Sequence, residues 1–80
     1  MGNYIATFFT HYDAILYQRA LRKLRIIGQM RPVPRRLSSS CGTCVSFEAA
    51  EEQLAALPQQ LPEQLVRVEQ DGYGDVIDNR

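Results

Sequence analysis

The sequence has no apolar run near the roughly 18 residues that a transmembrane helix needs, and its N-terminus lacks a basic region followed by an apolar stretch. It also lacks a glycine-rich phosphate-binding loop and a Ser/His/Asp arrangement, and it contains 1 histidine. These absences argue against a membrane protein, a secreted protein, and the commonest nucleotide-binding and hydrolase classes. We therefore expect a cytoplasmic protein with no membrane association.

The chain has 80 residues, which is enough for one domain, residues 1–80, with a thin hydrophobic core. Hydrophobic residues make up 45% of the chain and charged residues 22%, as in ordinary globular proteins. We expect the core to span about residues 4–70 and residues 71–80 to form a loose tail. A chain this short favours a site at the surface or at a dimer interface, so a homodimer is left open.

The formal net charge is 0, but the two halves of the chain have opposite charge. Residues 1–47 carry seven basic side chains and one acid, whereas residues 48–80 carry two basic side chains and eight acids. Two oppositely charged surfaces packed into one neutral domain would explain this distribution. A basic half that receives an anion or an acidic partner is the alternative explanation.

Periodicity predicts six elements in the order strand, helix, strand, strand, helix, strand. The predicted strands cover residues 4–9, 26–31, 43–47 and 65–69, and the predicted helices are one of about 13 residues after Thr10 and one over 48–57. This order is typical of the ferredoxin-like βαββαβ fold of the α+β class, an antiparallel sheet with two helices on one face. In the third strand, Val45 and Phe47 face one way and Cys44 and Ser46 the other.

The segment that joins the second and third predicted strands contains the residues with the most chemistry. Gly42 can adopt a positive φ without steric cost, which allows a tight turn immediately after Cys41. Backbone N–H groups in such a turn can bind an anion, and three serine hydroxyls add hydrogen-bond donors. These serines are Ser38, Ser39 and Ser40. The segment therefore favours a nucleophilic thiolate on Cys41, or a persulfide-type anion attached to it.

Two arginines, Arg35 and Arg36, precede the serines and would add positive charge if the loop folds back on Cys41. The second cysteine, Cys44, forms a Cys-x-x-Cys pair with Cys41 and could act as a resolving thiol. The pair leads into a predicted strand, however, where a helix dipole cannot assist. Cys44 is explained as well by a small buried side chain.

Other functions remain open at this stage. One Cys-x-x-Cys supplies only two of the four ligands of a structural zinc site, and a symmetric dimer could supply the other two. We nevertheless expect no metal and no cofactor. A nucleic-acid-binding module is disfavoured by the acidic second half, although a non-catalytic binding module of another kind is not. The single histidine, His11, could serve as a general base for Cys41, but the start of a helix explains its position as well.

Three segments resemble the small bacterial family of selenium/sulfur carrier-like proteins. They are 4–8 (YIATF), 10–14 (THYDA) and, above all, 34–42 (PRRLSSSCG), and the resemblance covers roughly residues 4–70. The resemblance implies that Cys41 is the carrier residue, which holds sulfur or selenium as a persulfide-type adduct between donor and acceptor proteins. The resemblance says less about Cys44. A carrier of this kind would be a shuttle without turnover of its own, and whether the protein is an enzyme is left open.

Overall fold

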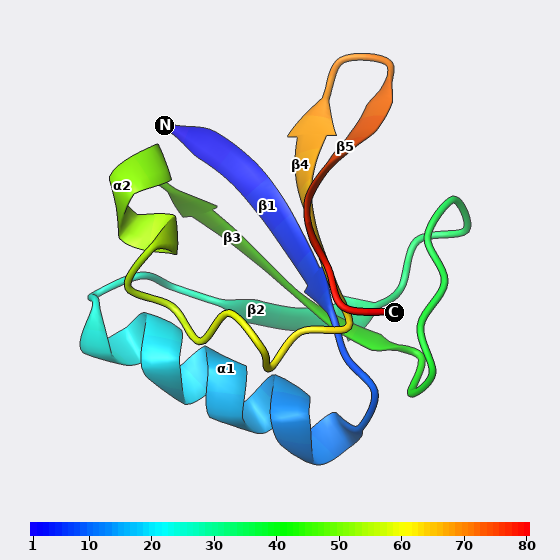
Figure 1. The fold of residues 1–80 in the computed structure, drawn as a ribbon, viewed down its shortest axis with the longest axis horizontal. Helices are drawn as coiled ribbons and strands as arrows, with labels where there is room; N and C mark the ends of the chain where they lie inside the picture. Colours follow the sequence, from blue (N-terminus) through cyan, green and yellow to red (C-terminus); the bar gives the residue numbers. More distant parts are fainter.

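The computed structural model describes all 80 residues, and its strands form one 5-stranded antiparallel sheet in the order β2-β3-β1-β4-β5. Helix α1 runs beneath the sheet, and the chain that joins β2 to β3 extends from one end of it (Figure 1). The elements are β1 (Gly2–Thr7), α1 (His11–Lys23), β2 (Gln29–Pro32), β3 (Thr43–Ala49), α2 (Glu51–Leu54), β4 (Gln64–Glu69) and β5 (Gly72–Asp78).

Strand β1 lies at the centre of the sheet and pairs with both β3 and β4. Its last residue, Thr7, lies opposite Cys44 of β3 and opposite Gln64 of β4. Because both pairings are antiparallel, the C-terminal end of β1 and the N-terminal ends of β3 and β4 meet at the same end of the sheet. The segments that enter or leave these strands there are consequently neighbours.

Helix α1 begins where the sequence predicts it and has the predicted length of 13 residues. The hydroxyl of Thr10 accepts a hydrogen bond from the Asp13 N–H, which satisfies one of the unpaired donors of the first turn. The buried face presents Ala14, Tyr17 and Leu21 to the sheet. Helical spacing of these side chains therefore accounts for both the helix and the side on which it packs.

The main hydrophobic core lies between the sheet and the two helices. Both helices contribute to it, so both cover the same face of the sheet, as predicted. Its buried members are Tyr4, Ala6, Phe8, Ala14, Tyr17, Leu21, Ile26, Val45, Phe47, Ala49, Leu54, Leu57 and Leu65. Gly28 belongs to this arrangement because a Cβ there would come within 2.6 Å of Leu21 Cδ1 and 2.9 Å of Val45 Cγ1.

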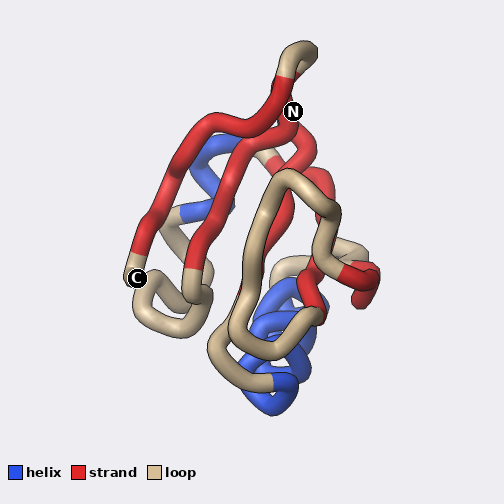
Figure 2. Tube along the Cα trace, turned by 90° about the vertical axis from the view of Figure 1, so that its right-hand side faces the viewer, coloured by secondary structure: helices blue, strands red, loops and turns tan.

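A smaller cluster of Ile5, Cys44 and Val66 lies on the opposite face of the sheet. Val33 and Leu37, from the connection between β2 and β3, pack on it. Figure 2 shows this connection as a long loop that arches in front of the strands. We call residues 33–42 the cysteine loop. Its apolar side chains Val33 and Leu37 hold it against the face of the sheet that the helices leave uncovered.

The predicted α+β class, with an antiparallel sheet and two helices, is confirmed, but the structure differs from the four-stranded βαββαβ pattern. Residues 71–80, expected as a loose tail, contain β5, so the strand count and strand order differ from the simple ferredoxin-like pattern. Gly72 lies opposite Glu69, and a tight turn therefore folds the chain back on β4. Gly72 and Gly74 both belong to this hairpin, where they pair with Glu69 and Arg67.

The second predicted helix is much shorter than residues 48–57. Strand β3 continues to Ala49, which pairs with Gly2, and α2 is a single turn of 4 residues. Alanine and glutamate favour helix locally, but pairing with β1 satisfies the backbone of residues 48 and 49 instead. No helix of the protein is both long enough and apolar enough to cross a membrane.

The C-terminus of α1 provides a first test of the fold. Arg25 has φ 62, the left-handed conformation that usually requires glycine at this position, and the next residue, Ile26, donates its N–H to Leu21 O. Arg25→Gly should therefore raise the free energy of unfolding by about 0.5–1 kcal/mol. Urea denaturation measures the change, and Arg22→Gly, inside the helix, should be destabilising by a similar amount.

Tyr17 provides a second test, because its hydroxyl is buried without a hydrogen-bond partner and burial raises the pKa of the phenol. Tyr17→Phe should leave stability unchanged or raise it by about 1 kcal/mol at neutral pH. In the unfolded chain the phenol ionises near pH 10, so wild-type stability falls as pH rises above that value. Chemical denaturation between pH 7 and 11 should show a smaller loss in the variant, and equal losses would contradict this account.

Candidate functional site

Cys41 lies half-buried at the end of the sheet where β1, β3 and β4 meet. Its side chain packs against the helix-side core, and its Sγ lies 3.5 Å from the carbonyl oxygen of Thr43, to which the thiol can donate. The thiol is free, and its two flanking residues, Ser40 and Gly42, are exposed. Cys41 therefore combines a packed side chain with access from solvent.

Ser39 connects Cys41 to the end of β1. Its hydroxyl donates to the carbonyl oxygen of Phe8 at 2.9 Å, and the same Oγ accepts the Cys41 N–H at 3.4 Å. It also lies 3.8 Å from the Cys41 Sγ. A serine hydroxyl has one hydrogen, so it can be given either to Phe8 O or to a sulfur anion on Cys41, but not to both.

Ser40 is fixed on the other side of Cys41 by a residue that sequence reasoning missed. Glu63 is buried, with 8% of its surface exposed, in the connection just before β4. Its Oε1 accepts the Ser40 N–H at 3.0 Å, and its Oε2 accepts the Ser40 hydroxyl at 2.9 Å. The sequence offers one sign of this role, which is the position of Glu63 between Pro62 and the apolar strand β4. An acid that is buried there needs a polar partner.

Gly42 has φ +74, which confirms the predicted turn after Cys41. A Cβ built on it would meet no atom within 4 Å, so the space beside the turn is open. Its carbonyl oxygen accepts a hydrogen bond from Val33 N–H, whereas its own N–H has no partner within the protein. The turn therefore presents one unused backbone donor next to the thiol.

Cys44 belongs to the opposite face of the sheet. It is buried in the small cluster with Ile5 and Val66, and its Sγ lies 3.6 Å from the carbonyl oxygen of Pro32. Burial raises the pKa of this thiol, the nearby Arg31 partly offsets that effect, and Cys41 adds to it. The two cysteines form no disulfide, and they pack into different clusters on different faces. This placement fits a small core side chain better than a resolving thiol.

The remaining predicted residues lie outside this arrangement. Arg36 reaches the turn between β4 and β5, where its Nη1 donates to Asp71 O at 3.2 Å, and Arg35 is exposed without a hydrogen bond. Ser38 is exposed, and its hydroxyl has no partner. His11 is exposed at the first position of α1 and makes no hydrogen bond to Cys41. The structure therefore brings Ser39, Ser40 and Gly42 to Cys41 but not the two arginines.

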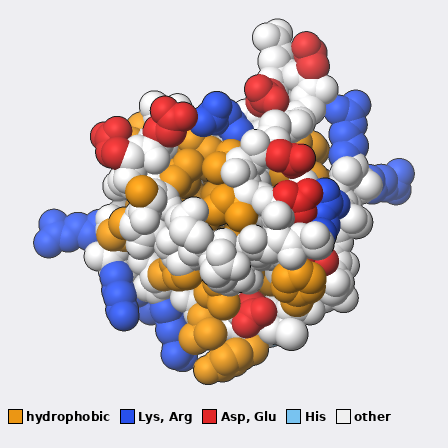
Figure 3. Space-filling view, viewed as in Figure 1, with side chains coloured by type: hydrophobic (Ala, Val, Ile, Leu, Met, Phe, Trp, Pro, Cys, Tyr) orange, Lys and Arg blue, Asp and Glu red, His pale blue; other side chains and the backbone are white.

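The charge asymmetry of the sequence persists at the surface. Figure 3 shows acidic side chains gathered around α2 and the β4–β5 turn, and basic ones along the side of α1 and at the cysteine loop. The protein has two ion pairs, Arg67–Glu51 and Arg80–Asp78. None of the seven basic side chains in residues 1–47 takes part in them, and all seven are exposed.

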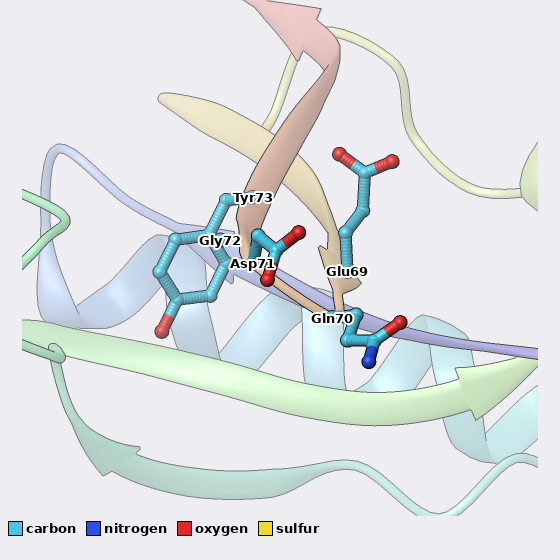
Figure 4. Close-up of a pocket in the computed structure, with 5 residues that line it drawn as sticks. All are labelled: Glu69, Gln70, Asp71, Gly72 and Tyr73. Atoms are coloured by element: carbon cyan, nitrogen blue, oxygen red, sulfur yellow. The ribbon is translucent and has the colours of Figure 1, made fainter.

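A hollow of about 380 Å³ lies at the β4–β5 turn, lined by residues 69–73. Figure 4 shows that the side chains of Glu69, Gln70 and Tyr73 diverge from the turn instead of converging on one point. No lining residue belongs to the Cys41 arrangement. No cluster of three or more histidine, cysteine or acidic side chains is placed to hold a metal ion. The Cys41 turn is therefore the best candidate site.

The different environments of the two thiols generate a prediction. In the native protein at pH 8, iodoacetamide should alkylate Cys41 readily and Cys44 at least about tenfold more slowly, because Cys44 must first be exposed by opening of the sheet. Peptide mapping after timed alkylation measures both rates, and in urea the two should become similar. Native reaction at Cys44 as fast as at Cys41 would contradict this placement.

Residues 3–70 match the model of a family described as "Putative Se/S carrier protein-like". Comparisons with curated proteins and with solved structures give no match. The matched region includes the whole cysteine loop, Cys41 and Glu63, and it ends before β5. Because the match covers most of the 80 residues, the chain belongs to this selenium/sulfur carrier-like family.

Proposed function

We propose that this protein carries sulfur or selenium as a persulfide-type adduct on Cys41. The observation on which the proposal depends is the turn at Cys41, where a half-buried free thiol lies beside an unused Gly42 N–H and the Ser39 hydroxyl. The description of the family to which the chain belongs supports carriage of selenium or sulfur, and the persulfide-type adduct on Cys41 is our proposal for its form. The adduct would be formed by one partner protein and consumed by another.

Loading of sulfur requires no net oxidation. The Cys41 thiolate attacks the outer sulfur of a persulfide on the donor, a new S–S bond forms on Cys41, and the donor's S–S bond breaks. The donor leaves as a thiolate, and its outer sulfur remains on Cys41 as the terminal sulfur of a new persulfide. Transfer to an acceptor thiolate is the same reaction in the opposite direction, so the protein needs no cofactor.

The turn offers two donors to the terminal anion of the adduct. The Gly42 N–H is free, and the Ser39 hydroxyl can rotate its hydrogen from Phe8 O to sulfur. Hydrogen bonds from such groups favour the anionic form. These hydrogen bonds stabilise the anion less than contact with an arginine would. Such modest stabilisation suits a carrier that must also release its cargo.

The two arginines of the cysteine loop have a different part in this proposal. The exposed Arg35 and Arg36 extend the unpaired positive surface of residues 1–47, which would attract an acidic donor or acceptor protein. Two free cysteines are suited to a reducing compartment, so we place the transfer in the cytoplasm.

Mass spectrometry tests the proposal directly. After incubation with a cysteine desulfurase and cysteine, wild-type protein should gain the mass of one sulfur atom, located on Cys41 by peptide mapping. Cys41→Ser should gain none, whereas Cys44→Ser should load as the wild type does, because Cys44 lies in the other cluster. A selenium-supplying donor tests the heavier element in the same way.

Two outcomes would contradict the proposal. One is the absence of an adduct on Cys41 under conditions that load an established carrier. The other is complete loss of loading in Cys44→Ser with the fold intact, which would indicate a two-cysteine redox mechanism. Circular dichroism of each variant provides the control for folding.

A further inference from the structure

The carboxylate of Glu63 is committed to a single residue of the cysteine loop. Its two oxygens accept the N–H and the hydroxyl of Ser40, at 3.0 Å and 2.9 Å, across 23 positions of the sequence. No ion pair engages this buried side chain. Hydrogen bonds to a carboxylate are stronger than neutral ones, and Glu63 makes two of them to one residue, so this contact is a strong polar link between the loop and the rest of the protein.

The backbone of Glu63 is itself held on both sides. Its N–H donates to Thr7 O at 2.7 Å, and its carbonyl oxygen accepts Asn79 N–H at 2.9 Å. These bonds tie the residue to the end of β1 and to the chain after β5. The position of Glu63 is therefore set by the sheet, and its carboxylate holds the cysteine loop in place.

Cys41 follows directly after this attachment. On one side, Ser39 fastens the loop to Phe8, and between Ser39 and Cys41 stands Ser40, held by Glu63. On the other side, Gly42 leads into β3. The Cys41 backbone is thus bracketed by two attachments and a strand, while Leu37 anchors the earlier part of the loop on the opposite face.

We propose that Glu63 is a positioning residue for Cys41: through Ser40 it holds the turn that presents the thiol and the free Gly42 N–H. The reason to position Cys41 rests on the proposed carrier function. The contacts between Glu63 and Ser40, however, are present in the protein without a sulfur or selenium adduct. The effect of Glu63 is geometric, because a second negative charge near Cys41 would disfavour a sulfur anion there.

Two substitutions of Glu63 separate the effect of side-chain length from the effect of the negative charge. Glu63→Asp keeps the charge but withdraws the carboxylate by one methylene, and Glu63→Gln removes the charge but keeps one oxygen that can accept a hydrogen bond. Glu69→Gln, at an exposed acid on β4 that makes no ion pair and no hydrogen bond to Ser40, is the control for loss of an acidic charge. Ser40→Ala removes the hydroxyl of the contact and leaves the N–H in place.

Amide hydrogen exchange measured by NMR gives the primary readout, with the Val45 amide in the inner strand β3 as reporter of global opening. In Glu63→Asp, exchange at Ser40 should be roughly tenfold faster or more, while Val45 changes much less. Glu63→Gln should have an intermediate effect, and Glu69→Gln none. Iodoacetamide should also react faster with Cys41 in Glu63→Asp, because the turn opens more often, and this increase should persist across pH 6 to 9.

Each other outcome overturns the proposal. Unchanged exchange at Ser40 in Glu63→Asp would show that the contact does not hold the loop, and equal acceleration at Ser40 and Val45 would show a purely global effect. A shifted pH midpoint of Cys41 alkylation in Glu63→Gln, with Glu63→Asp unchanged, would assign the effect to charge instead. Sulfur loading is not needed for any of these measurements, so failure of wild-type protein to load would reject the carrier function alone.

Discussion

The antiparallel pairing of β1 with both β3 and β4 is the constraint on which the rest of this structure depends. It places Thr7 opposite Cys44 and Gln64, so the chain entering β3, the chain leaving β1 and the chain entering β4 come together at one end of the sheet. Cys41, Phe8 and Glu63 lie in those three connections. A slip of one residue in either pairing would reverse the faces of the strand and separate the groups that now surround the thiol.

The polar groups of the cysteine loop divide between structure and chemistry. Ser40 gives both of its donors to Glu63, and Ser39 gives its hydrogen to Phe8 O, so most of the donors that the Ser-Ser-Ser run offers are used to hold the loop. The Gly42 N–H remains free beside the thiol for a ligand. A loop held by many internal bonds and presenting few free donors is preorganised, which reduces the entropy lost when a partner binds.

Much of the fold was predictable because local pattern and burial agree. The spacing of Ala14, Tyr17 and Leu21 predicted α1, and alternation predicted that Val45 and Cys44 would face opposite sides of the sheet. The prediction was wrong where tertiary pairing overrides local propensity. Ala49 pairs with β1 instead of joining a long second helix, and the glycine-containing C-terminal segment forms β5 because β4 offers an unpaired edge.

The sequence alone determined the chemistry that is available: a thiol followed by glycine, three adjacent serines, two arginines, and the local periodicities of most elements. Only the tertiary structure decided which of these groups act together. Glu63 lies 23 positions from Ser40, and its role depends on strand register, which no local pattern encodes. The two thiols are three positions apart in sequence but lie on different faces of the sheet. Side chains of β3 point alternately to the two faces, whereas Cys41 lies in the turn before β3 and does not follow this alternation.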